Sequence, residues 1–404
     1  MLQKILYRFL ERRHFWRYVG FDEVAELYAA RLLRMTATGL MSTFAAVYLL
    51  RSGYSLVFIC VFYTIYFLLK AGVMFPAAQY VARFGPKHAM LLANILNIPA
   101  VVAFSLLPMY GVYALAVYCI FLAPSVSMYG LAHNVSFSKV KSAHNAGKEI
   151  SFMSMMDKVA SGLSPLLGGI IAWLISPQAT MWVAALLYIV AALPLFRSAE
   201  PVMTRQKISF TGFPWHMAWR SLRSDFAIGF DYGASQFLWP LFLTVFVFAS
   251  SGSEIYAQIG GLATITLVIG FIAARTYGIL IDRRRGRELL QYATYANTVV
   301  HLIRPFTGTP FSAALVNGCN EAATIGYSMA FIRGMFDIAD ETGHRIAYLL
   351  MMEAIYNIGA ALLFAIVGVI FIYASQYTAF TSGFILTGIA TLIIARTNFP
   401  IYRR

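Results

Sequence analysis

The sequence predicts an all-α integral membrane protein with 12 transmembrane helices in two pseudo-symmetric six-helix bundles. Hydrophobic residues make up 60% of the 404 residues and charged residues only 12%, and the mean hydropathy is +0.69. These values lie outside the range of soluble globular domains. The net charge of +14 is spread over short connectors between apolar runs, so the sequence predicts a lipid bilayer and no nucleic acid as its environment.

Apolar runs of about 20 residues can cross a bilayer, because backbone groups in hydrocarbon must be satisfied within the segment. By this test we expect twelve spans, at residues 28–50, 55–81, 88–107, 110–136, 150–175, 178–196, 226–250, 255–281, 288–306, 309–333, 346–374 and 377–396. The expected domains are a cytoplasmic amphipathic helix (1–20), an N-terminal six-helix bundle (21–196), a cytoplasmic linker (197–225) and a C-terminal six-helix bundle (226–404). Pro240 after Trp239 predicts a kink in the seventh span.

Lysine and arginine alternate strongly between the connectors. One set contains almost all of them, including "DRRRGR" at 282–287, whereas the opposite set has Arg51 as its basic residue. This asymmetry predicts a multi-pass protein of the cell membrane, in bacteria the cell inner membrane, with both termini in the cytoplasm. Cys60, Cys119 and Cys319 lie in apolar segments without metal-type spacing, so we expect no metal and no cofactor.

An internal repeat relates the two halves of the chain. A shift of 196 residues aligns Met155, Met156 and Asp157 with Met351, Met352 and Glu353. A second repeated motif is "GILIDRRRGRE" at 278–288, which has a weaker copy, "AQYVARFGPKH", at 78–88. Duplicated halves are typical of transporters, in which the substrate site lies between the repeats near the middle of the membrane.

These motifs resemble those of the major facilitator superfamily. The motif at 278–288 is similar to the cytoplasmic-loop motif of that family through Gly278, Asp282, Arg283, Gly286 and Arg287, whereas the first copy has Ala78 and Ala82 in place of the glycine and the aspartate. "SPLLGG" at 164–169 is similar to the GPxxGG element of its drug/proton antiporters. The resemblance implies a monomeric transporter that works by alternating access, and the last element favours antiport.

The resemblance also implies which spans line the cavity and which form the interface between the halves. Ionisable groups inside spans are costly and therefore mark functional sites. The predicted cavity residues are Arg34, Lys70, Gln236, Trp239, Asn317 and Asn320. Glu321 and Asp231 are the proton-coupling candidates, because a desolvated carboxylate can exchange a proton near neutral pH.

The predicted gate residues lie in the interface spans. They are Asp157, Arg275, Glu353, Gly278, Asp282 and Arg283. Asp157 and Arg275 are expected at similar depth and therefore to pair across the halves, and Glu353 is expected to pair with Lys70. Arg31 is expected to reach the lipid–water interface, and His133, Arg333 and Arg304 are assigned no transport role.

The sequence therefore predicts a secondary active transporter that is coupled to protons and moves an amphipathic or anionic organic small molecule. The antiporter-like element favours export. The alternative is a non-transporting relative of the same fold that serves as a membrane receptor or assembly protein, which Ala82 favours. The chain has no HExxH, GxSxG or phosphate-loop pattern, so we do not expect an enzyme.

Overall fold

The computed structural model describes residues 21–140, 146–196 and 208–402, and every regular element in these ranges is helical. The amphipathic helix predicted over residues 1–20 lies outside the described residues. Within the described ranges, eight helices are long and apolar enough to cross a membrane by length and composition. The protein is an all-α integral membrane protein.

The first half of the described chain has six long helices. They are α2 (Phe21–Arg51), α3 (Leu56–Phe84), α4 (Pro86–Ser105), α6 (Val112–Val140), α7 (Ala146–Leu174) and α8 (Pro177–Ala192), with the short α5 (Leu107–Tyr110) and the 3₁₀ turn η1 (Leu193–Phe196). Ser55 and Ser176 cap α3 and α8 by accepting a backbone N–H bond. Such caps satisfy amide groups that the helix itself leaves unpaired.

The second half has a composite seventh span and five further long helices. The composite span consists of α9 (Trp215–Gly233), η2 (Ala234–Leu238), α10 (Trp239–Phe242) and η3 (Leu243–Val247). The others are α11 (Ile255–Asp282), α12 (Gly286–Ile303), α13 (Pro310–Glu341), α14 (Arg345–Tyr373) and α15 (Gln376–Ala395), with the 3₁₀ turns η4 (Arg304–Phe306) and η5 (Pro400–Tyr402).

Pro240 lies where the seventh span departs from regular α-helical hydrogen bonding; the predicted kink itself stays a prediction. The segments η2 and η3 on either side of α10 are π-helical. Proline lacks the N–H that would bond to the preceding turn, and its ring crowds that turn, so the helix widens locally. The side chains of Ser235, Gln236 and Trp239 are thereby reoriented relative to those of α9.

The predicted linker over 197–225 is wrong at its C-terminal end, because α9 begins at Trp215. This part of α9 is amphipathic. Trp215, Trp219 and Arg223 are exposed at four-residue spacing, whereas Ala218 and Leu222 are buried. A search for continuous apolar runs misses such a turn, since only one of its faces is apolar.

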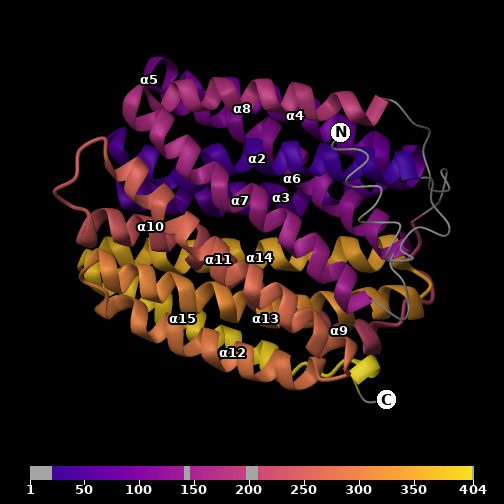
Figure 1. Ribbon diagram of the computed structural model, residues 1–404. Coiled ribbons are helices and arrows are strands. Elements are labelled where there is room, and N and C mark those ends of the chain that lie inside the picture. Colours follow the sequence, from indigo (N-terminus) through magenta and orange to yellow (C-terminus); the bar gives the residue numbers. More distant parts are fainter. Residues whose placement is uncertain (1–20, 141–145, 197–207, 403–404) are drawn as a thin grey trace.

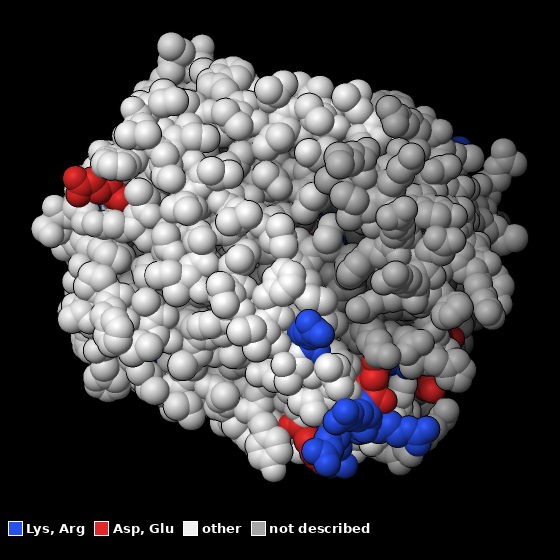
Figure 2. Space-filling view, viewed as in Figure 1, with Lys and Arg blue, Asp and Glu red and all other residues white. Residues whose placement is uncertain are grey.

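Two pairs of helices join the halves, and their contact is called the seam below. Helix α7 packs along α11, and α3 packs along α14, as Figure 1 shows. The end of the bundle that carries residues 208–214 and η5 is called the linker end, and α5 lies at the opposite end (Figure 1). Charged side chains gather toward the linker end, while the broad face between the ends is nearly uncharged (Figure 2).

Glycine brings α7 and α11 into backbone contact. A Cβ atom on Gly169 would lie 2.4 Å from the carbonyl oxygen of Tyr256, and one on Gly260 would lie 2.4 Å from that of Pro165. About one turn further along, past Pro165 and Gly260, the hydroxyl of Thr264 donates to the carbonyl oxygen of Gly162 at 2.8 Å. Small residues permit close helix approach in a bilayer, where apolar burial alone does not drive association.

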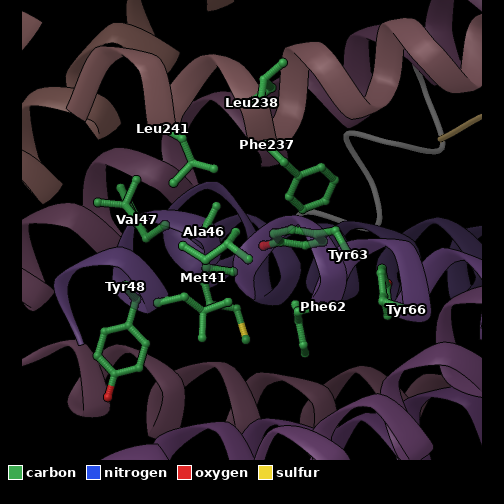
Figure 3. Close-up of a cluster of buried hydrophobic side chains, with 14 of the residues drawn as sticks. Met41, Ala46, Val47, Tyr48, Phe62, Tyr63, Tyr66, Phe237, Leu238 and Leu241 are labelled. Carbon is green, nitrogen blue, oxygen red and sulfur yellow. The ribbon is translucent and has the colours of Figure 1, made fainter. Parts of the chain in front are cut away.

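Aromatic rings fill the seam beside α3. The ring of Tyr63 lies 4.4 Å from that of Phe237 and 5.1 Å from that of Phe364, between ring centroids. Figure 3 shows Tyr63 of α3 beside Phe237 of the composite span. These contacts connect α3 of the first half with η2 and α14 of the second half.

Gly260→Ala should destabilise the protein by roughly 1–3 kcal/mol, because the added methyl group forces α7 and α11 apart. The matched control is Gly261→Ala, since a Cβ at Gly261 would meet nothing within 4 Å. This control should be neutral or slightly stabilising. Thermal unfolding of the purified variants in detergent measures both effects, and equal melting temperatures for the two variants would contradict the close contact.

Candidate functional site

A cavity of about 190 Å³ lies between the two halves. The first half contributes α2 and α7, and the second half contributes the composite span, α11, η4 and α13. The lining residues are Gly39, Ser42, Ser161, Gly162, Pro165, Ser235, Gln236, Trp239, Pro240, Leu243, Ile259, Leu262, Ala263, Thr266, Leu267, Arg304, Asn317, Asn320 and Glu321. A cavity with polar groups between inward-facing helices is a typical ligand site of a helical membrane protein.

The π-helical turn and α13 provide most of the polar lining. The indole Nε1 of Trp239 donates to Oδ1 of Asn317 at 2.6 Å, which fixes the ring against α13. Oδ1 of Asn320 is buried and has no hydrogen-bond donor among the described residues. A buried acceptor without a donor is costly, and a bound solute with an N–H or O–H group can satisfy it.

Arg304 is the cation of the cavity lining, and its side chain is fully buried. Its Nη1 donates to Nδ1 of His301 at 2.9 Å, and its Nη2 donates to Oγ of Ser235 at 3.0 Å. The guanidinium carbon lies 5.2 Å from the ring centroid of Trp239, within cation–π range. Its Nε–H is buried and has no acceptor among the described residues.

Asp231 balances the charge of Arg304 through two intermediate groups. His301 Nε2 lies 2.6 Å from Oδ1 of Asp231, and the hydroxyl of Ser235 donates to the same oxygen at 3.1 Å. The hydroxyl of Tyr327 donates to Oδ2. The carboxylate therefore accepts bonds at both oxygens and does not line the cavity.

These contacts fix the tautomer of His301. Since Nδ1 accepts a hydrogen bond from Arg304, it carries no proton, and Nε2–H donates to Asp231. A neutral imidazole thus connects the carboxylate with the guanidinium. Protonation at Nδ1 would place two donors against each other and displace Arg304. His301 is therefore a positioning residue for the arginine.

Comparison with known proteins agrees with this architecture. Residues 27–303 match the family model described as Major Facilitator Superfamily. The chain belongs to the major facilitator superfamily. A search of the curated proteins finds no match.

Solved transporter structures share the fold of this superfamily member. The Escherichia coli fucose:proton symporter FucP has a TM-score of 0.65 at 16% identity, with 92% of this chain and 97% of that chain covered. The human organic anion transporter TETRAN has a TM-score of 0.68 at 11% identity, with coverage of 92% and 99%. A bacterial homologue of the iron transporter ferroportin, in an outward-facing state, has a TM-score of 0.65 at 16% identity, with coverage of 93% and 97%.

Arg34 was predicted to line the cavity, and this prediction is wrong. The face of α2 that carries it packs inside the first half. Its Nη1 donates to Oδ1 of Asn94 at 2.6 Å, and its Nη2 donates to Oγ of Ser125 at 3.2 Å. The guanidinium carbon lies 4.0 Å from the ring centroid of Tyr129. Arg34 therefore connects α2 with α4 and α6.

Lys70 is likewise absent from the cavity lining. It is buried at the seam, with its ammonium nitrogen 5.3 Å from the ring centroid of Phe67. It is close enough to Glu353 for the two charges to interact. Glu353 itself accepts a bond of 2.9 Å from Nδ2 of Asn134 in α6, across the seam. A gate function of Glu353 and Lys70 stays a prediction.

The predicted pair of Asp157 and Arg275 is wrong in this conformation. Asp157 is bound by Arg31 within its own half: Nε of Arg31 donates to Oδ1 at 2.7 Å, and Nη2 donates to Oδ2 at 2.5 Å. The prediction that Arg31 reaches the lipid–water interface is therefore wrong. Arg275 is exposed. Beside Arg275 the hydroxyl of Ser151 in α7 donates to the carbonyl oxygen of Ala274. Arg275 therefore lies near the level of Ser151, six residues of α7 or about 9 Å from Asp157.

The remaining predicted gate residues lie near the linker-end terminus of α11. Gly278 is buried, Asp282 is the last helical residue and Arg283 is the exposed C-cap. Their gate function stays a prediction. The residues of the network around Asp231 that the sequence did not identify as site residues are His301, Arg304 and Tyr327. The spacing of His301 and Arg304, one helical turn apart in an apolar span, is the signal that could have indicated them.

The pair of Arg31 and Asp157 can be tested by charge exchange. Arg31→Glu and Asp157→Lys should each lower the stability, and the double variant should recover a coupling energy of about 0.5–3 kcal/mol. Arg275→Glu combined with Asp157→Lys is the control and should give no recovery. Thermal unfolding in detergent gives the four values of each cycle. Recovery with Arg275 in place of Arg31 would reinstate the pairing predicted from the sequence.

Proposed function

We propose that this superfamily member is a secondary active transporter that carries a small organic anion together with a proton by alternating access. The observation that carries the proposal is Arg304, a buried guanidinium in the cavity lining whose Nε–H has no acceptor among the described residues. A carboxylate or similar anion would satisfy this donor and gain the attraction of the positive charge. Arginine is well suited to such recognition.

The cavity favours a small and partly polar solute. Its volume of about 190 Å³ is below the roughly 300–1,000 Å³ that is usual for sites of drug-sized ligands. The amide of Gln236 and Oδ1 of Asn320 can bond polar substituents, and the ring of Trp239 offers an apolar face. These features support an organic anion with hydroxyl or amino groups more than the amphipathic compound considered from the sequence.

Glu321 provides the link to the proton. It lines the same cavity as Arg304, so an ionised Glu321 opposes the binding of an anion, whereas a protonated one does not. Proton binding and anion binding therefore favour each other, which is the thermodynamic requirement for cotransport in one direction. The cavity thus favours symport over the antiport predicted from the element at 164–169.

The orientation follows from the distribution of basic residues. The connectors rich in arginine lie at the linker end, and the positive-inside rule places such connectors in the cytoplasm. We therefore propose that the linker end faces the cytoplasm. The names of two structural neighbours, an organic anion transporter and a fucose:proton symporter, are compatible with the two parts of the proposal, although the likeness itself concerns the fold.

Arg304→Gln should weaken substrate binding by about 1.5–3 kcal/mol, an affinity loss of roughly ten- to hundredfold, because a charge-assisted hydrogen bond is lost. Uptake of labelled organic acids into proteoliposomes, with and without a pH gradient, measures the effect.

Because Asp231 loses its counter-charge in this variant, Arg304→Gln combined with Asp231→Asn should recover folding without recovering uptake. Arg396→Gln, at an exposed position, is the matched control. Wild-type vesicles that transport no organic acid would support the receptor alternative instead.

Glu321→Gln should remove the pH dependence of anion binding. In the wild type, affinity should rise as the pH falls, because protonation of Glu321 removes a negative charge from the cavity. The glutamine mimics the protonated acid, so the variant should bind tightly at all pH values and fail to couple transport to the gradient. Binding isotherms of the purified protein at several pH values decide this. An unchanged pH profile in the variant would exclude Glu321 from coupling.

A further inference from the structure

Asp225 is a buried acid outside the cavity. It lies in α9, six residues before Asp231. Its side chain is only 8% exposed. Among the described residues it has neither a hydrogen-bond donor nor an ion-pair partner. Charged carboxylates that are buried in a protein are nearly always paired, because burial removes the water that stabilises the charge. The isolation of Asp225 therefore requires an explanation.

The position of Asp225 on α9 directs it toward α14. Ser221, Asp225 and Gly229 are four residues apart and share one face of the helix. The hydroxyl of Tyr348 donates to Oγ of Ser221 at 2.8 Å. A Cβ atom on Gly229 would lie 2.1 Å from the carbonyl oxygen of Tyr356. The two helices thus touch on both sides of Asp225.

The charge that acts on Asp225 from these neighbours is negative. Glu353 of α14 is the charged side chain that interacts with it electrostatically, and α15, which also packs on α9, has no charged residue between Gln376 and Ala395. On α9 itself, Arg223 is exposed. The other titratable groups that interact with it are the tyrosines Tyr327 of α13 and Tyr348 and Tyr356 of α14.

We infer that Asp225 holds a proton in the folded transporter and exchanges it with water at the linker end during transport. A neutral carboxyl group needs no counter-ion, which explains how an isolated acid persists beside Glu353. The site lies about 15 Å along α9 from Trp215, by the rise of 1.5 Å per residue, and so between the cavity and the linker end. Asp231, in contrast, accepts bonds at both oxygens and has no need of a proton.

Proton release from Asp225 would act on the seam. It places a second negative charge near Glu353, which is held by Asn134 of the first half at 2.9 Å. Repulsion between the two carboxylates then disfavours the present position of α14 relative to α6 and α3. The inference rests on the proposed proton coupling and adds to it a second protonation site, at which the ligand is the proton itself.

Asp225→Asn separates this role from a structural one. The amide resembles the protonated acid in shape and charge, so the variant should fold with the melting temperature of the wild type and should exchange labelled substrate for unlabelled substrate across vesicles. Accumulation driven by a pH gradient should fall to the level reached without a gradient. Asp225→Glu keeps the carboxyl group and should retain accumulation. Glu254→Gln, at an exposed position, should change neither activity.

The outcomes distinguish this inference from the proposed function. If wild-type vesicles exchange no organic anion, the proposed function fails. If they do, and Asp225→Asn still accumulates substrate as the wild type does, the inference is overturned. A second readout does not depend on transport. The infrared spectrum of the wild type at neutral pH should contain the band of a protonated carboxyl group, which Asp225→Asn lacks, and an unchanged band would contradict the inference even if the variant transported poorly.

Discussion

Burying the guanidinium of Arg304 inside a membrane domain requires both a compensating negative charge and acceptors for its N–H groups. Asp231 supplies the charge, and His301 and Ser235 supply acceptors at 2.9 and 3.0 Å. These bonds hold the arginine in place, while its Nε–H has no acceptor among the residues that the structure describes. The π-helical segment before Pro240 is part of the same arrangement, since Ser235 in it and the adjacent Trp239 both contact the arginine. The fold thus stabilises an incompletely satisfied cation in the cavity lining.

In the proposed alternating-access mechanism, the seam decides how such a site is exposed to either side of the membrane. Along α7 and α11 the halves approach to backbone contact through glycine, whereas α3 and α14 meet through aromatic rings, and Glu353 of α14 is bound by Asn134 of α6. A glycine contact has few side-chain interlocks and permits rocking of one half on the other. The charged groups near Glu353 are sensitive to protonation, so we expect them to bias the rocking. We therefore expect protonation to affect both the cavity and the seam.

Much of the fold could be predicted from the sequence, because apolar length, basic connectors and an internal repeat each constrain the topology separately. Side-chain partners were harder to predict. Asp157 and Arg275 were expected at equal depth, but the bond between Ser151 and Ala274 places Arg275 six residues of α7, about 9 Å, from the level of Asp157. Arg304 was assigned no transport role because it lies at the end of a span, but its side chain reaches back into the bundle. Asp225 was assigned to the linker because the amphipathic start of α9 contains too few apolar residues to be recognised as part of a span.

The claim that Arg304 selects an anion can be tested most directly with pairs of ligands that differ in charge alone. Purified protein would be heated with small organic acids and, separately, with their uncharged amides, and the shift in melting temperature would be recorded at low pH. A ligand that binds the folded state raises the melting temperature by mass action. We expect stabilisation by acids whose amides have no effect, and loss of that stabilisation in Arg304→Gln. Equal stabilisation by an acid and its amide, or stabilisation that survives in Arg304→Gln, would contradict the account.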